Sequence, residues 1–248
     1  MGLLLTVAYD GTDYCGWQEQ AVGVPTVCAV LKAAAEEVLG CPIKILGASR
    51  TDAGVHAAGQ RAHIIPEKPS RVPIHKLAKV FNAFLPDDIA ITAALEVSDD
   101  FHPIKDAVSK TYSYKIFNHP HRNPLIGRFS AHESSPLDLE AMQAACRHFI
   151  GQHDFASFCA TGSSATTTVR RVNFLDITCE NNLLDIKING NGFLYNMVRI
   201  IAGTLLEVGM GKILPEYIPD IIAAKDRTKA GKTMPAQGLT LLEVFYRY

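Results

Sequence analysis

The chain has little net charge and no long apolar run. Its 24 Lys and Arg residues nearly balance 25 Asp and Glu residues, which leaves a formal charge of −1 over 248 residues. A protein that holds nucleic acid through its overall charge would be strongly basic, so any such binding must rely on local patches. No apolar stretch approaches the length needed to cross a bilayer, and we therefore expect a soluble globular protein that does not contact membranes.

The six cysteines lack the spacing of a metal site or a disulfide framework. They stand at 15, 28, 41, 146, 159 and 179, without a Cys-x-x-Cys pair or a close cysteine–histidine cluster. Scattered thiols are typical of a reducing compartment, where cysteine behaves as a small buried apolar residue. The first residues, MGLLLTVAYDGTDY, also lack the basic start and cleavage site of a secretory signal. We expect a cytoplasmic protein that holds no metal.

Strand-like and helix-like segments alternate through the first hundred residues. The patterns predict strands at 3–9, 43–48, 60–65 and 89–97, and helices at 27–39 and 74–84. Pro25-Thr26 introduces the first helix, and Gly40 stands at its expected end. The stretch GASRTDAGVHAAGQ, residues 47–60, joins two predicted strands, so RTDAGVHA should lie on a loop.

The second half of the chain shows the same mixed pattern. Strands are predicted at 107–117, 170–179, 183–189 and 239–246, and helices at 136–150, 193–208 and 215–225. A boundary between 100 and 106 separates residues 1–104 from residues 105–248. We expect an α+β fold of two α+β halves, each with an antiparallel or mixed sheet and helices on one face.

Asp52 is the first candidate for chemistry. Glycines at 47, 54 and 59 permit close backbone approach or a positive φ, which a loop needs when it holds a side chain against a ligand. The simpler interpretation is that Asp52 caps a turn by accepting a backbone N–H. Arg50 and His56 in the same loop favour a binding site, because clustered charged and titratable groups are typical of one.

Arg199 is the second candidate. It is the only charge before Glu207 in FLYNMVRIIAGTLLEVG, residues 193–209, which reads as a helix that is apolar almost all round. A buried guanidinium requires an anionic partner, and Glu207 lies too far along the helix to serve. Asp52 is one of the few acids in an unusual setting. The open alternative is that Arg199 reaches solvent or binds a backbone carbonyl.

Aromatic and basic residues give a weaker signal for nucleic acid. Tyr112 and Tyr114 alternate on a predicted strand, so both rings point to one face, where they either fill the core or offer one ring to a nucleobase. Solvation explains any single cluster of cations, but several clusters on a neutral protein fit a surface that follows phosphates. The candidates are Lys225, Arg227, Lys229, Lys232, Arg170 and Arg171.

The order of the motifs resembles the tRNA pseudouridine synthase A family. From about residue 9 to residue 242 they are YDGTDYCGWQ, RTDAGVHA, KTYSY, FLYNMVRIIAGTLLEVG, AAKDRT and QGLTL. RTDAGVHA is highly specific, and the others gain weight from their order. Ser49 stands where the family more often has Gly, and Cys15 replaces a commonly aromatic residue. Neither departure changes Asp52.

The resemblance implies a pseudouridine synthase fold with its active-site cleft between the two halves. It implies an isomerase that detaches uracil from its ribose and reattaches it through carbon, at uridines 38, 39 and 40 in the anticodon stem-loop of tRNA. It also implies a homodimer that needs neither a metal nor an organic cofactor.

The resemblance also assigns roles to residues. Asp52 would be the nucleophile, and Tyr112 would stack on the flipped-out uracil. Arg199 would pair with the aspartate, Leu239 would pack on the base side of the pocket, and Arg50 would help to hold the flipped nucleotide or its phosphate. A carboxylate attacks only when it is ionised, and an arginine partner would keep Asp52 ionised in a pocket with little water.

Two other classes of function stay open on the residues alone. A non-catalytic tRNA-binding module would share the basic clusters, but it would not need an acid poised in the loop. A glycosidase-like hydrolase would use a second carboxylate as the acid/base partner of Asp52. Neither RTDAGVHA nor KTYSY supplies that second acid.

Overall fold

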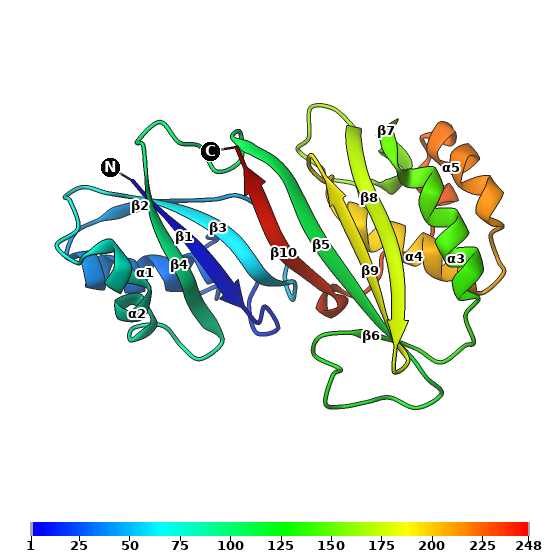
Figure 1. Cartoon of the computed structure of the whole chain (residues 1–248), viewed down its shortest axis with the longest axis horizontal. Coiled ribbons are helices and arrows are strands. Elements are labelled where there is room, and N and C mark those ends of the chain that lie inside the picture. The colour runs from blue at the N-terminus through cyan, green and yellow to red at the C-terminus, as the bar shows by residue number, and fades with distance from the viewer. Residues whose placement is uncertain (1, 248) are drawn as a thin grey trace. The chain divides into compact units, whose positions relative to one another are not determined.

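The computed structural model describes residues 2–247 and divides into two compact units (Figure 1). Unit 1 comprises Met1–Val108 with Leu241–Tyr248, and unit 2 comprises Ser109–Thr240. The sequence placed a boundary at 104 and the whole last strand in the second half. In the structure, strand β10 (Leu239–Tyr246) begins in unit 2 and ends in unit 1, where it lies beside β3 (His56–Pro66).

Within the described residues, unit 1 combines strands with the helices α1 and α2. The strand order is β4-β1-β3-β10, with β2 paired to β3 off this path, and β1 is antiparallel to both of its neighbours. The helices touch each other, and α1 contacts β2 while α2 contacts β4. The remaining bounds are β1 Gly2–Tyr9, β2 Ile43–Gly47, β4 Ile89–Val97, α1 Val27–Leu39 and α2 Ile74–Asn82.

The ends of α1 follow from its capping residues. The Thr26 hydroxyl accepts the backbone N–H of Ala29 at 3.3 Å, which satisfies one of the free donors at the helix start. Gly40 adopts the left-handed conformation, with φ 65°, and donates its N–H to the Glu36 carbonyl. Both ends of the predicted helix are confirmed, and its apolar side is buried against the sheet.

Within the described residues, unit 2 combines strands with the helices α3, α4 and α5. Its strands run in the order β5-β9-β8-β7, and β6 pairs in parallel with β5. A hairpin joins β8 to β9 through Asn181 and Asn182, which both have positive φ, a conformation that asparagine tolerates in such turns. The bounds are β5 Ala107–Asn118, β6 Ala131–Glu133, β7 Gly151–Asp154, β8 Val169–Glu180, β9 Leu183–Gly190, α3 Leu139–Cys146, α4 Met197–Gly209 and α5 Ile218–Ala224.

Several elements differ from the prediction. Strand β3 begins at His56, four residues early, which shortens the loop before it to residues 48–55. Helix α4 begins only at Met197, because Asn196 takes a left-handed conformation with φ 59° that a continuous helix does not allow. Gly151, predicted to end a helix, has φ 109° and opens the short strand β7.

Candidate active site

The 48–55 loop between β2 and β3 holds Asp52 through its backbone. Gly54, with φ 76°, turns the chain, so that the Val55 N–H donates to the Asp52 carbonyl at 3.1 Å. The Gly54 N–H itself donates to the Tyr14 carbonyl at 3.2 Å. The Asp52 side chain is half-buried. The turn that follows Asp52 in the chain therefore fixes the backbone of this residue.

Residues 9–17, most of the YDGTDYCGWQ motif, pack against this loop just before Asp52. The Tyr9 and Thr51 hydroxyls form a buried hydrogen bond of 2.7 Å. The Trp17 N–H donates to the Thr51 carbonyl at 3.1 Å. Gly16 has φ 89° and approaches so closely that a Cβ there would lie 2.6 Å from the same carbonyl. Local sequence patterns do not reveal this role, because each contact joins residues that lie far apart in the chain.

His56 supports the other end of the loop. It is buried, and its Nδ1 accepts the Gly11 N–H at 3.1 Å and lies 3.1 Å from an Asp10 carboxylate oxygen. A Cβ on Gly11 would lie 2.0 Å from the Val55 carbonyl, so the two backbones touch. The sequence had grouped His56 with the exposed binding loop. Its burial makes it part of the support beneath that loop.

Gln60 ties the start of the loop to β3. Its fully buried amide donates to the Ser49 carbonyl at 2.7 Å and accepts the Ser49 N–H at 3.1 Å. Both contacts use the Ser49 backbone, which a glycine would offer equally, so the departure from the family pattern leaves them intact. Arg50, the next residue, is exposed and can reach a ligand.

The two tyrosines of β5 have different surroundings within unit 2. Tyr112 is buried and meets Phe193 edge to face, with ring centroids 5.2 Å apart. Tyr114 is fully buried and donates its hydroxyl to the Pro235 carbonyl at 2.7 Å. Burial raises the pKa of Tyr114 far above its usual value. Tyr114 is thus a structural residue, whereas the orientation of Tyr112 is set by a neighbouring ring.

Arg199 lies in the first turn of α4 with a fixed guanidinium. Its Nε donates to the Met234 carbonyl at 2.7 Å, and its Nη1 donates to the Asn196 side-chain oxygen at 2.7 Å. The side chain is half-buried. Arg199 therefore binds a backbone carbonyl, and this contact orients its guanidinium.

Leu239 is the first residue of β10 and is buried. It follows a short 3₁₀ turn, Ala236–Gly238, that passes over the Tyr114 ring. A Cβ on Gly238 would lie 2.6 Å from that ring, so only glycine permits this path. The position of Leu239 thus depends on the path of the chain segment that precedes it.

Three of the six basic candidates are held by contacts within unit 2. Lys225 forms an ion pair with Asp154 at 2.8 Å, and this contact lowers the pKa of the Asp154 carboxyl. Arg227 donates to the carbonyls of residues 230 and 231, and Arg170 to those of residues 167 and 169. The other three, Arg171, Lys229 and Lys232, are exposed.

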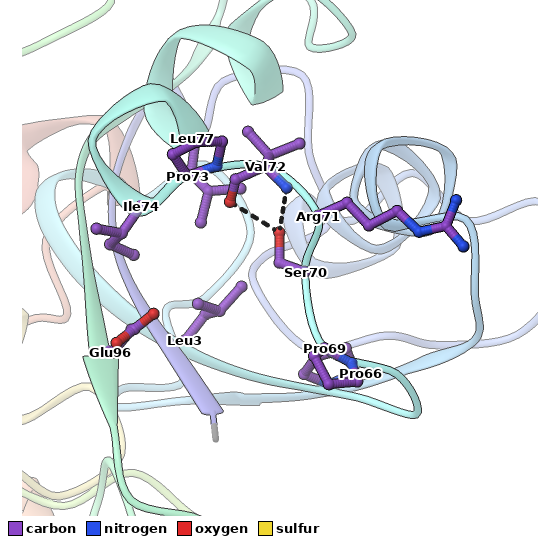
Figure 2. A pocket seen from close by; sticks show the side chains of 10 residues that line it. All are labelled: Leu3, Pro66, Pro69, Ser70, Arg71, Val72, Pro73, Ile74, Leu77 and Glu96. Carbon is purple, nitrogen blue, oxygen red and sulfur yellow. Dashed lines mark hydrogen bonds between the residues drawn. The ribbon is translucent and has the colours of Figure 1, made fainter.

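A pocket of about 310 Å³ lies elsewhere in unit 1 (Figure 2). Leu3 at the start of β1, Pro66 at the end of β3 and Leu77 of α2 contribute to its mostly apolar lining. Because Leu3 pairs with Ile64 whereas Tyr9 pairs with Ala57, this pocket sits at the opposite end of β1 and β3 from the Asp52 loop. Asp52 is not among its lining residues.

Within residues 2–247, no group of three or more His, Cys, Asp or Glu side chains could hold a metal ion. The six cysteines are free thiols. In the same part of the chain, no helix has the length and apolar character that crossing a membrane requires.

Comparison with known proteins decides the family. A family model described as tRNA pseudouridine synthase matches residues 5–104 and 145–247. The chain belongs to the tRNA pseudouridine synthase family. It is therefore an isomerase that acts on tRNA, and the hydrolase and the non-catalytic module are set aside. The matched ranges include Asp52, Arg199 and Leu239, whereas Tyr112 lies between them.

Curated relatives of this pseudouridine synthase match it along nearly its whole length. The tRNA pseudouridine synthase A of Caldicellulosiruptor saccharolyticus is 47% identical over 98% of this chain and 99% of its own. The proteins of the same name from Ruminiclostridium cellulolyticum and Pelobacter propionicus are each 47% identical over 98% of both chains.

A solved structure, that of a Cbf5-Nop10-Gar1 complex, contains a chain 12% identical to this synthase, with a TM-score of 0.40. The match covers 96% of this chain and about half (48%) of that one. The family assignment rests on the sequence matches alone.

Proposed function

We propose that this pseudouridine synthase modifies uridines 38, 39 and 40 in the anticodon stem-loop of tRNA, with Asp52 as its nucleophile. The observation that carries the proposal is the way the 48–55 loop is held. Hydrogen bonds to Thr51 on one side and the turn through Gly54 on the other keep the aspartate in one position. A nucleophile held in this way needs little reorganisation before attack.

The reaction exchanges one bond to the ribose for another. The target uridine leaves the stem, and the Asp52 carboxylate attacks either ribose C1′ or uracil C6. The bond between C1′ and N1 breaks, the uracil turns, and a bond forms between C1′ and C5. The bond that Asp52 made to C1′ or C6 breaks as well, and its electron pair returns to the carboxylate. C5 loses its proton to solvent, and N1 ends with a proton. Electrons and atoms balance, so no cofactor is required.

The other site residues are assigned to binding. Tyr112 stacks on the extruded uracil, and its contact with Phe193 supports this by fixing the ring. Arg199 supplies a positive charge that keeps Asp52 ionised, and Leu239 offers an apolar surface to the base. Arg50 holds the flipped nucleotide or its phosphate, which its exposure supports.

Three further expectations belong to the same proposal. Arg171, Lys229 and Lys232 bind the phosphates of tRNA, because exposed cations are the groups that can replace its counterions. The enzyme acts as a homodimer, as the family resemblance implies. It acts in the cytoplasm, which its scattered free thiols support.

Replacing the nucleophile tests the proposal. Asp52→Asn should bind tRNA as the parent does and release no tritium from uridine labelled at C5. Asp87→Asn, which makes the same change at an exposed acid of unit 1, should release tritium normally. Mapping of derivatised pseudouridine in the same tRNA then identifies the modified positions. Near-normal release by Asp52→Asn would overturn the assignment, and an abasic product would overturn the isomerase reaction.

A further inference from the structure

The segment that leads into β10, residues 227–238, lies against α4 with its backbone in direct contact. A Cβ on Gly203 of α4 would lie 1.9 Å from the Lys232 carbonyl oxygen. A Cβ on Gly231 would lie 2.6 Å from the Thr204 nitrogen. Both positions therefore require glycine, and the approach fixes how far the segment stands from the helix. We call residues 227–238 the connecting segment.

Thr204 joins the helix to the connecting segment. Its fully buried hydroxyl accepts the Gly231 N–H at 2.9 Å and donates to the Ile200 carbonyl one turn earlier at 2.9 Å. Without this hydroxyl the buried Gly231 N–H would lose its partner, which makes the contact costly to remove.

Arg227 holds the connecting segment in its folded shape. Its Nη1 donates to the Gly231 carbonyl at 2.9 Å and to the Ala230 carbonyl at 3.2 Å, and its Nη2 donates to the Thr233 hydroxyl at 3.0 Å. A planar guanidinium presents donors in this fixed arrangement, and a lysine ammonium does not. The side chain is half-buried, as a residue that binds its own loop should be.

The far end of the connecting segment contacts residues of the proposed site. The Met234 carbonyl accepts from Arg199 Nε at 2.7 Å, and the Met234 N–H donates to the Arg199 carbonyl at 3.3 Å. The Pro235 carbonyl accepts the Tyr114 hydroxyl, and Leu239 follows directly in the chain. The guanidinium of Arg199 and the side chain of Leu239 therefore move with the connecting segment.

We propose that Arg227 and Thr204 are positioning residues for the isomerisation, which fix the connecting segment and through it the Arg199 guanidinium and Leu239. The inference rests on the proposed function, because the roles of Arg199 and Leu239 come from it. It replaces the expectation that Arg227 binds an RNA phosphate. A displacement of about 1 Å at a reacting centre can lower a rate about 100-fold, so a loosened segment should reduce turnover strongly.

Arg227→Lys separates the two roles of Arg227. The variant keeps the positive charge but loses the planar set of guanidinium donors. A positioning role therefore predicts that its single-turnover rate at saturating tRNA is at least about tenfold lower than that of the parent. The salt dependence of tRNA binding should not change, because the variant keeps every cation of the segment. A phosphate contact predicts the reverse pattern, in which Arg227→Lys is nearly normal and Arg227→Gln weakens binding and flattens the salt dependence. That pattern would overturn the inference.

Thr204 supplies an independent test that does not rely on Arg227. Thr204→Val is nearly isosteric and removes the hydroxyl, whereas Thr204→Ser retains it. Thr204→Val should lower the single-turnover rate and speed hydrogen exchange at the Gly231 amide, and Thr204→Ser should restore both. Rates are measured well below each thermal midpoint. Equal rates for Thr204→Val and the parent, with exchange accelerated, would assign Thr204 to stability alone and overturn its positioning role.

The result is distinguishable from a failure of the proposed function. If Asp52→Asn is inactive and both Arg227→Lys and Thr204→Val react at the parent rate, only the positioning inference fails. If Asp52→Asn stays active, the nucleophile assignment fails, whatever the positioning variants do. A further check combines Arg227→Lys with Arg199→Lys. The double variant should lose less of the rate than the product of the two single losses, because both residues act through the Arg199 guanidinium.

Discussion

The Tyr9 hydroxyl lies 2.7 Å from the Thr51 hydroxyl, in a buried contact one residue before Asp52. The two residues are 42 positions apart in the chain, and their contact joins β1 to the loop that carries the proposed nucleophile. Because each hydroxyl is buried, removing one leaves the other without this partner, which typically destabilises a protein by about 1–3 kcal/mol. The hydrogen bond thus links stability to the placement of Asp52.

Single and double substitutions test this link. Tyr9→Phe and Thr51→Val should each lower the free energy of unfolding by about 1–3 kcal/mol, and the double variant should lose less than the sum of the two. Each single variant should also turn over more slowly at saturating tRNA. Thr92→Val, at an exposed position of β4, should change the free energy of unfolding by less than about 0.5 kcal/mol. Losses that add in the double variant would show that the hydroxyls act separately.

The basic residues should divide into two groups in their effect on tRNA binding. Replacing Arg171, Lys229 and Lys232 with Gln removes three exposed cations. Each phosphate contact contributes about 0.7–0.9 to the slope of log K against log salt concentration, so the triple variant should flatten the slope by about 2–3.

Lys225→Gln is the matched comparison for this measurement. The Lys225 ammonium already lies 2.8 Å from the Asp154 carboxylate, so its removal should alter the salt slope much less than any one of the three. The slope is obtained from tRNA dissociation constants over a range of salt concentrations. An unchanged slope in the triple variant would remove these residues from the phosphate surface.

The proposed cooperation of Asp52 and Arg199 concerns the reaction, and single-turnover rates test it. Asp52→Glu keeps a carboxylate in a shifted position, and Arg199→Lys keeps a cation in another geometry. If the guanidinium keeps the carboxylate ionised, the fold-loss in the single-turnover rate of the double variant should be smaller than the product of the two single losses. Tyr217→Phe is the control, because Tyr217 is an exposed residue of unit 2. When it is combined with Asp52→Glu, the rate loss of the double variant should equal the product of the two single losses. Independent effects of Asp52→Glu and Arg199→Lys would contradict the assignment.

Local signals in the sequence predicted those elements whose ends are set by nearby residues. Thr26 and Gly40 define α1 because a cap acts within one turn, and the two asparagines after β8 define a hairpin because they tolerate positive φ. Strand β4 was predicted at its observed bounds, Ile89–Val97. The position of Asp52 on a loop between two strands followed from the same local patterns.

The rest depended on contacts between distant parts of the chain. No local pattern indicates that the segment around Gly16 packs against the Asp52 loop, or that Arg227 turns back onto its own segment. A cation near other cations looks the same in sequence whether it binds phosphate or a carbonyl. The late start of α4 depends on the single conformation of Asn196, which the apolar pattern around it does not reveal.

His63 should make the protein sensitive to mild acid. Its ring is fully buried on β3 and packs edge to face on Phe101 at 5.6 Å, and within residues 2–247 neither ring nitrogen has a hydrogen-bond partner. Burial disfavours the charged ring and lowers the pKa of His63 below its ordinary value of about 6.5. Between these two pKa values the unfolded chain binds more protons than the folded one, so the free energy of unfolding falls as the pH drops below about 6.5.

His63→Met isolates this contribution, because it fills a similar volume with an apolar side chain that does not titrate. Urea unfolding between pH 5 and pH 8 should give a constant difference between parent and variant above about pH 7. Below about pH 6.5 the difference should move in favour of the variant by up to about 1.4 kcal/mol per pH unit. His75→Met, at an exposed position of α2, should follow the parent throughout. If the His63→Met curve stayed parallel to that of the parent down to pH 5, the buried ring would not be the group that senses acid.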